Sequence, residues 1–253
     1  MFSRASQLLG PSIDELLWAT SGGTTLSTPC VLRLAAEMLA RLQALHAAGY
    51  VHNDVSLRNF CMGRGGEALV AGGTRAKASP PDDSCASTVY LVDFGLATRV
   101  GGYAENTTTG TPLFASAAAH RGQRRRCEPA DDLEALCFIL AYLGSGALPW
   151  EHANASADVF AAKQAVRADQ LTEGLPQSLA DAIGALWRLA RVGRPPATRS
   201  ESTAAVAEYA CDAPWPTACR DALLGLAAPA PYDWETAGIS WSSTGEIQRQ
   251  RAG

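Results

Sequence analysis

The sequence predicts a mostly helical α+β fold with a few short strands, and three observations carry this prediction. Apolar residues recur at every third or fourth position in several long runs, which is typical of amphipathic helices. One short run rich in β-branched and aromatic residues is typical of a buried strand. The 253 residues are 47% hydrophobic, so the chain can bury a sizeable core as one domain.

The first long helix is predicted in "STPCVLRLAAEMLARLQALHAAGY". Thr28 can cap it, Pro29 fits its first turn, and Gly49 closes it. Its apolar residues fall at helical spacing: Val31, Leu34, Met38, Leu42 and Leu45. The segment that follows Gly49 is therefore a loop directly after a helix with a buried face, where side chains are held rigidly and still reach solvent.

A short buried strand is predicted in "STVYLVDFGLA", ending at Asp93. Between it and the first helix, residues 64–87 are rich in Gly, Ala, Ser and Pro. We expect this stretch to be a surface insertion that joins two short strands.

The second half of the chain predicts further helices. A second buried helix lies in "CEPADDLEALCFILAYLGSGALPW", with acidic residues in its first turn and Gly144 near its end. Helical patterns also occur at 156–170, 176–192, 199–210 and 216–227. After Glu235 the chain turns polar, which predicts a domain over 1–235 followed by a polar tail over 236–253.

Charge and cysteine content exclude several classes of protein. A net charge of -4 gives no electrostatic reason to expect nucleic acid or an anionic membrane as a partner. The seven cysteines are scattered and form no C-x-x-C pair, which predicts reduced thiols in an intracellular compartment, cytoplasmic or nuclear. The start "MFSRASQLLGPS" lacks the apolar core of a signal peptide. The longest apolar run is too short and too rich in glycine to span a bilayer.

Two polar motifs carry the chemistry. The predicted loop "GYVHNDVSLRN" holds His52, Asp54 and Asn59, and the predicted strand ends in the Asp-Phe-Gly that begins at Asp93. A His-x-Asp with an Asn five residues later, followed by a separate Asp-Phe-Gly, is similar to the pattern that protein kinases use for phosphoryl transfer.

The resemblance extends along the chain. The segments "LLGPSIDELL", "LHAAGYVHNDVSLRNFCMG", "VDFGLA", "GTPLFAS", "DDLEAL", "GALPWE" and "YDWE" occur in the order seen in the casein kinase I superfamily. The chain resembles the large helical lobe of that group from about Leu8 to Glu235, and "NFCMGRG" and "PYDWE" resemble the tau-tubulin kinase branch. The resemblance implies a protein-kinase-like fold, mainly its helical C-terminal lobe with short strands around the two motifs. It also implies transfer of the ATP γ-phosphate to Ser or Thr hydroxyls of proteins.

The resemblance assigns roles to individual residues. Asp54 would accept the proton of the attacking hydroxyl, and Asn59 and Asp93 would be the oxygen ligands of Mg²⁺. Leu9 would offer backbone hydrogen bonds to the adenine of ATP, and Cys61 and Val92 would form the floor of its pocket.

The departures from the family are equally informative. A complete kinase also has a Gly-rich loop and a lysine on its third strand, but the chain resembles the family only from the hinge onward. Its two lysines, Lys77 and Lys163, both follow the His-x-Asp motif. Ser56 stands where the usual lysine follows the base, so Arg58 is either a functional substitute or a solvated surface arginine. Asn53 replaces the usual arginine, which predicts independence from a phosphorylated activation loop.

The remaining histidines and arginines have structural as well as functional interpretations. His52 is expected to pack under the Asp-Phe-Gly loop, His120 to be structural, and His46 and His152 to be surface or boundary residues. Three consecutive arginines form either a solvated basic turn or, with Arg167, a site for acidic or phosphorylated protein substrates: Arg124, Arg125 and Arg126.

Two alternatives to an active protein kinase stay open. One is a truncated chain or pseudokinase that binds proteins without catalysis. The other is a small-molecule phosphotransferase of the aminoglycoside-kinase type, against which the intact Asp-Phe-Gly and the "GTPLFAS" segment argue.

Overall fold

The computed structural model describes residues 9–63, 88–104, 110–121, 125–153, 155–192, 231–241 and 246–249. The predicted insertion at 64–87, the helical patterns at 199–210 and 216–227, Arg124 and Lys77 lie outside these residues.

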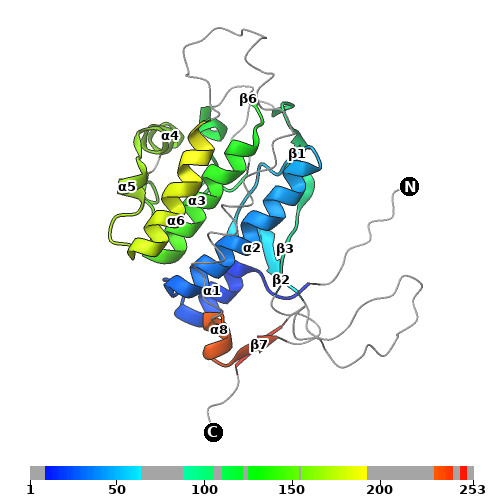
Figure 1. The fold of residues 1–253 in the computed structure, drawn as a ribbon, viewed down its shortest axis with the longest axis vertical. Helices are drawn as coiled ribbons and strands as arrows, with labels where there is room; N and C mark the ends of the chain where they lie inside the picture. Colours follow the sequence, from blue (N-terminus) through cyan, green and yellow to red (C-terminus); the bar gives the residue numbers. More distant parts are fainter. Residues whose placement is uncertain are drawn as a thin grey trace, which may run out of the picture.

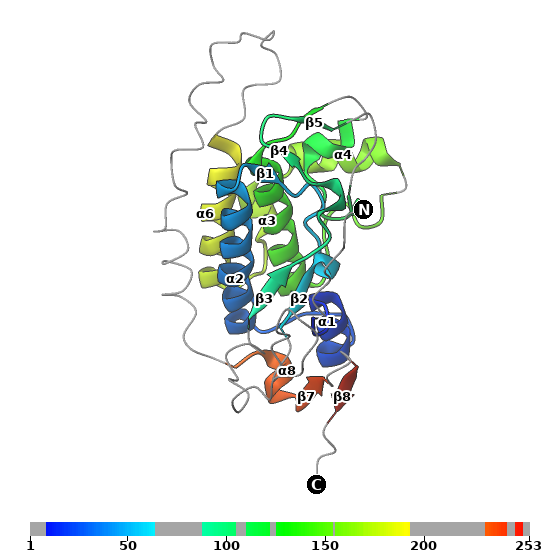
Figure 2. The ribbon, with the colours of Figure 1, turned by 90° about the vertical axis from the view of Figure 1, so that its right-hand side faces the viewer.

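Three long helices lie side by side and form the centre of the fold: α2 (Thr28–Ala47), α3 (Pro129–Ser145) and α6 (Gln177–Val192) (Figures 1 and 2). Four shorter helices lie around them: α1 (Ile13–Ser21), α4 (Ser156–Ala165), α5 (Ala168–Leu171) and α8 (Asp233–Thr236). The described residues also contain three short 3₁₀ turns: η1 (Leu57–Asn59), η2 (Phe94–Leu96) and η3 (Ala117–Arg121). The long helices coincide with the runs of helical periodicity.

The strands form four antiparallel pairs of two or three residues each. They are β1 (Tyr50–Val51) with β4 (Thr98–Arg99), β2 (Phe60–Met62) with β3 (Val89–Leu91), β5 (Tyr103–Ala104) with β6 (Arg125–Arg126), and β7 (Ile239–Trp241) with β8 (Ile247–Arg249). β3 lies within the run predicted as a strand. The β2–β3 pair lies against α2, where Arg41 donates a hydrogen bond to the Val89 carbonyl at 2.7 Å.

Helix α3 is the core of the molecule, because nearly every one of its side chains is buried. Phe138 lies at its middle, with its ring centroid 4.6 Å from that of Trp150 and 5.8 Å from that of Trp187. Acidic residues occupy the first turn, where the positive end of the helix dipole stabilises negative charge. α3 ends before Gly146, whose φ of 79° is the left-handed conformation that glycine adopts at helix ends.

The start of α2 differs by one residue from the prediction. Ser27, not Thr28, is the N-cap, and its backbone N–H and hydroxyl both donate to the carboxylate of Asp233. The sequence could not indicate this partner because 206 positions separate the two residues. The N-terminus of α2 is thereby joined to α8.

Part of the segment predicted as a polar tail, 236–253, forms the β7–β8 hairpin. The β7–β8 hairpin lies beside α8, at the end of the molecule opposite β5 (Figure 2). Ile239 is buried, and Trp241 donates from Nε1 to the Gly63 carbonyl at 3.3 Å. Apolar residues alternate with polar ones here, so one face of a short hairpin packs on the core although the segment is polar on average.

Within the described ranges no helix is both long and apolar enough to cross a membrane. Cys30, Cys61, Cys127 and Cys137 are free thiols.

A fully buried lysine lies between α4 and the core. Lys163 is 0% exposed, and its Nζ lies 5.2 Å from the ring centroid of Phe138 and 5.1 Å from that of Trp150. Burial lowers the pKa of Lys163 from 10.5 to about 7, and the nearby negative charge of Glu134 opposes that shift. The ammonium form is therefore costly inside the fold.

This burial makes the free energy of unfolding depend on pH. Between pH 7 and about 9 the unfolded chain binds a proton at Lys163 that the folded chain has released, so stability rises with pH by up to about 1.4 kcal/mol per pH unit. Above pH 9 the contribution of Cys30 to this slope has the opposite sign, because burial raises the pKa of its thiol to about 12. Urea denaturation from pH 7 to 8.5 measures the slope. Lys163→Met should flatten this slope. Equal slopes in both proteins would show that the pH dependence does not come from Lys163.

Candidate functional site

The β2–β3 ladder brings the two predicted motifs together. Phe60 pairs with Leu91, and the ladder continues for one more bond, because Val92 donates its N–H to the Asn59 carbonyl at 2.9 Å. Asn59 and Asp93 thus leave the same end of the ladder next to each other. Residues that are 34 positions apart in the sequence become neighbours through this pairing.

The carboxylate of Asp132 fixes the loop that carries Asp54. Its Oδ2 accepts from the His52 N–H at 2.8 Å, and its Oδ1 accepts from the Asn53 N–H at 2.9 Å. His46 Nε2 lies 2.8 Å from the same Oδ2. Asp132 is 1% exposed and lies in the first turn of α3, so the helix N-terminus offsets part of the cost of burying its charge.

Asn53 joins this loop to the segment after Asp-Phe-Gly. Its φ is 65°, a conformation that Asn adopts more readily than most residues. The side-chain Nδ2 donates to the Leu96 carbonyl at 2.9 Å and lies 3.0 Å from Thr98 Oγ1. Asn53 therefore has a structural role.

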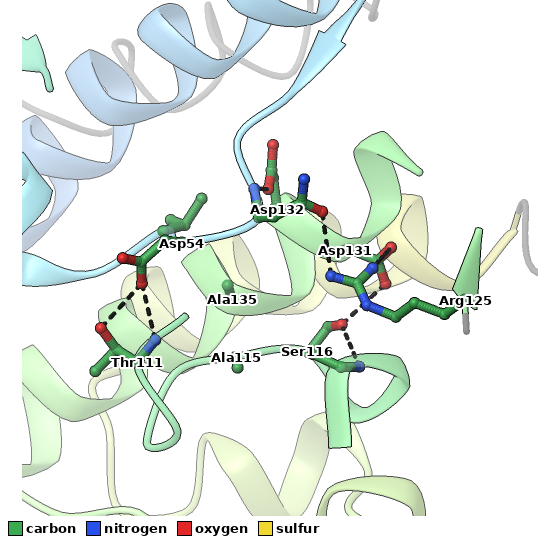
Figure 3. Close-up of a pocket in the computed structure, with 11 residues that line it drawn as sticks. Asp54, Thr111, Ala115, Ser116, Arg125, Asp131, Asp132 and Ala135 are labelled. Carbon is green, nitrogen blue, oxygen red and sulfur yellow. Dashed lines mark hydrogen bonds and ion pairs between the residues drawn. The ribbon is translucent and has the colours of Figure 1, made fainter. Parts of the chain in front are cut away.

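The Asp54 carboxylate is oriented from two sides, and Figure 3 shows one of them, the contact with Thr111. Its Oδ1 accepts from the backbone N–H of Thr111 at 2.8 Å and from the Thr111 hydroxyl at 3.0 Å. Its Oδ2 accepts from Asn59 Nδ2 at 3.1 Å, and the same Nδ2 donates to the Asp54 carbonyl at 2.8 Å. The carboxylate is half-buried, and Oδ2 keeps room for a further donor.

Gly110 permits this close approach. Its φ is 86°, and a Cβ there would lie 2.7 Å from the Asn53 carbonyl oxygen and 3.0 Å from Asp54 Oδ1. Any larger residue would push Thr111 away from the carboxylate.

The expected role of His52 is confirmed. The side chain is 0% exposed, its Nε2 lies 3.0 Å from the Val92 carbonyl oxygen, and its ring meets Phe94 edge-on at a centroid distance of 5.3 Å. His52 packs under the Asp-Phe-Gly turn and supports Asp93 from below.

Asn59 and Asp93 have the chemistry of Mg²⁺ ligands. Asn59 uses its Nδ2 for Asp54, which leaves its amide oxygen as an acceptor. Asp93 has a φ of 58° and an exposed carboxylate that, among the described residues, accepts only a long 3.3 Å bond from the Gly95 N–H. Mg²⁺ in proteins is commonly held by one or two such oxygens together with phosphates and water. Among the residues with described positions, no group of three or more His, Cys, Asp or Glu could hold a metal ion by itself.

Leu9, Cys61 and Val92, the predicted adenine-contacting residues, lie near this ladder and are all half-buried. The Gly10 N–H donates to the Met62 carbonyl at 2.9 Å, so the chain at Leu9 runs alongside β2. Burial, and secondarily the charge of Glu15, raises the pKa of the Cys61 thiol, which keeps it neutral and apolar in character.

Arg58 lies at the surface, with 81% of its side chain exposed, and its Nε is 3.2 Å from Asp14 Oδ2 on α1. An ion pair this exposed contributes little to stability. The arginine is therefore free to change partner if an anion with more charge approaches.

The structure corrects the expectation for the arginine cluster. Arg125 is not solvated: it is 8% exposed, with Nη1 2.8 Å from Asp131 Oδ2 and Nη2 3.1 Å from Asn53 Oδ1 (Figure 3). Successive side chains of a strand point to opposite faces, so only Arg126 faces out from β6, where it pairs with Glu128 at 3.0 Å. Arg167 is exposed and pairs with Asp169.

His46 also differs from the expectation, because it is 4% exposed and bonded to Asp132 rather than a surface or boundary residue. His152 is exposed. His120 is buried, as a structural residue should be, and its Nε2 lies 3.1 Å from the Pro112 carbonyl oxygen.

Sequence reasoning missed three residues of the site: Thr111, Asp132 and Lys163. The first two lie in "GTPLFAS" and "DDLEAL", which carried the resemblance without individual roles. Lys163 had a weaker signal, a lone lysine in an otherwise apolar stretch of a chain with only two lysines.

A small cavity of about 10 Å³, room for about one water molecule, lies between the Asp54 loop and α3 and is lined in part by Asp131, Ser116 and Ala135 (Figure 3).

Comparison of the sequence with models of known protein families gave no match.

Replacing Asp132 tests the support of the loop. Asp132→Asn exchanges one acceptor oxygen for a donor that faces backbone N–H groups, so it should cost about 3 kcal/mol in the free energy of unfolding. Urea denaturation measures this cost. Asp181→Asn, at an exposed Asp that accepts from Gln177 one turn away, is the control and should change stability by less than about 0.5 kcal/mol. Equal effects of the two substitutions would contradict the role of Asp132.

Proposed function

We propose that the chain is a protein serine/threonine kinase of the casein kinase I type, which transfers the ATP γ-phosphate to protein hydroxyls with Mg²⁺ as cofactor. One observation carries the proposal: a rigidly held carboxylate, Asp54, is hydrogen-bonded to Asn59, and strand pairing brings the segment of Asp93 next to Asn59. A general base next to a Mg²⁺-phosphate site is the arrangement that phosphoryl transfer to a hydroxyl needs.

Asp54 is suited to receive the proton of the acceptor hydroxyl. Thr111 occupies Oδ1 with two donors, whereas Oδ2 accepts only from Asn59 among the described residues. The remaining lone pair of Oδ2 can accept a hydroxyl proton without displacing these bonds. Because Thr111 and Asn59 hold the carboxylate in one orientation, little reorganisation is needed when a substrate binds.

Asn59 and Asp93 would hold Mg²⁺, which neutralises charge on the phosphates when bound. His52 fixes the turn that presents Asp93. Arg58 would supply positive charge to the transferring phosphate in place of the lysine that Ser56 replaces. Its exposed pairing with Asp14 supports this role, because a screened surface pair is exchanged at little cost.

A non-catalytic scaffold is the second candidate. Phe94 and Leu96 are 52% and 41% exposed and give the surface around Asp93 an apolar character that suits a protein partner. The lysine within the described part of the chain, Lys163, lies in the core and cannot serve a nucleotide. A chain with these features can bind a partner without transferring phosphate.

Phosphate transfer from γ-labelled ATP to a mixed protein substrate tests the proposal. The assay needs millimolar MgATP, because the sequence offers neither a Gly-rich loop nor its lysine partner. Asp54→Asn should lower kcat at least about 1,000-fold, since it removes the base and turns an amide toward the hydroxyl. Equal rates in both proteins would place the reaction elsewhere. No transfer by the wild-type chain, even when fused to a nucleotide-binding lobe, would favour the scaffold.

Arg58→Ala tests whether Arg58 supplies charge to the transferring phosphate, and it is best measured in that fusion. Loss of a charge that acts mainly in the transition state should lower kcat on the order of 100-fold with little change in KM for ATP. Ser56→Lys in the same variant should recover part of the loss. Arg188→Ala, at another exposed arginine, on α6, is the control and should have no effect. Full activity of Arg58→Ala would make Arg58 an ordinary surface residue.

A further inference from the structure

The segment that contacts Asp54 is itself held from behind by a buried amine. Lys163 Nζ donates to the carbonyls of Pro112 and Ala115, each at 2.7 Å, and lies 3.1 Å from His120 Nε2. Pro112 directly follows Thr111, whose N–H and hydroxyl bind the Asp54 carboxylate. One side chain from α4 thus holds the segment whose first residue, Thr111, binds the Asp54 carboxylate.

We propose that Lys163 is a positioning residue for the Asp54 carboxylate and acts through the segment 111–115. The inference rests on the proposed role of Asp54 as the base, but its geometric part stands apart from any catalytic activity. Lys163 lies in the core and acts on Asp54 only through the bonds of Thr111.

The chemistry of the pocket requires an amine. Lys163 Nζ donates to two carbonyls, those of Pro112 and Ala115, and even a neutral amine has the two N–H groups that these bonds need. The rings of Phe138 and Trp150 close the pocket and favour a cation over their faces. A methionine would fill the same volume at less cost, so packing alone does not explain a lysine here.

The surroundings limit the pocket to one positive charge. His120 on η3 lies next to the amine, and burial, followed by the charge of Lys163, lowers the pKa of its imidazole. Glu134 on α3 faces the pocket and pairs with Arg191 of α6 at 3.1 Å, and Arg191 Nη2 lies 3.4 Å from the Lys163 carbonyl oxygen. Arg191 thus offsets part of the negative charge of Glu134 near the amine.

Other contacts do not replace the lysine. Trp150 Nε1 donates to the Leu113 carbonyl at 2.8 Å, and Ser116 Oγ donates to Asp131 at 2.9 Å. These bonds fix the middle and the end of the segment. Pro112, next to Thr111, depends on Lys163 and on the neighbouring His120.

Amide hydrogen exchange of the full chain, read by mass spectrometry on peptides that cover 110–116, tests the geometric step. Lys163→Met keeps the volume and removes the donors to both carbonyls, so exchange at Thr111 should accelerate at least about 10-fold while α2 and α3 exchange as in the wild type. Lys163→Gln retains an N–H₂ group on a shorter side chain and should give an intermediate rate. If the methionine variant does not fold, the glutamine variant carries the test.

Leu179→Ala separates positioning from general stability. Leu179 is buried and packs beside Gly144 of α3, so its loss should accelerate exchange in α3 and α6 without a selective effect on 110–116. If Lys163→Met produced this same uniform pattern, or left Thr111 protected, the positioning role would be overturned.

Kinetics in the phosphate-transfer assay then distinguish the two proposals. A displacement of the segment should lower kcat on the order of 10- to 100-fold in Lys163→Met with KM for ATP unchanged, and Lys163→Gln should recover part of it. Selective loosening of 110–116 without any phosphate transfer by the wild type would refute the kinase and keep the geometric step. Normal protection with normal kcat in both variants would refute the positioning role alone.

Discussion

The buried carboxylate of Asp132 is the interaction on which the rest of the site depends. It lies where α3 begins, so the helix N-terminus stabilises a charge that would otherwise be expensive inside the core. Its two oxygens fix two successive backbone N–H groups, those of His52 and Asn53. Asn53, which one of these bonds holds, has a φ of 65° and directly precedes Asp54.

Asp54 therefore lies between two independent supports. Behind it, α3 fixes the backbone through Asp132, and in front of it, α4 fixes the Thr111 segment through Lys163. The β2–β3 ladder provides a further support, because it places Asn59 against the same carboxylate. Elements from three parts of the chain thus hold one side chain in place. This gives Asp54 the rigidity that its proposed role as general base requires.

The sequence predicted what depends on local pattern. Helices α2, α3 and α6 follow from apolar periodicity, β3 follows from its β-branched residues, and the packing role of His52 follows from its place beside the motif. It did not predict contacts that join distant positions. Asp132 meets His52 across 80 residues, and Lys163 meets Ala115 across 48. Arg125 shows the same limit, since only strand pairing decides which of two adjacent arginines turns inward.

The complete burial of Lys163 has a consequence for covalent labelling of the protein. The chain contains two lysines, Lys77 and Lys163, and the amine of Lys163 is out of contact with solvent while the core is intact. Amine-reactive reagents and lysine-modifying enzymes therefore cannot reach the Lys163 side chain in the native protein. Reaction at Lys163 would report that the core has opened, which gives the molecule a built-in chemical probe of its own unfolding.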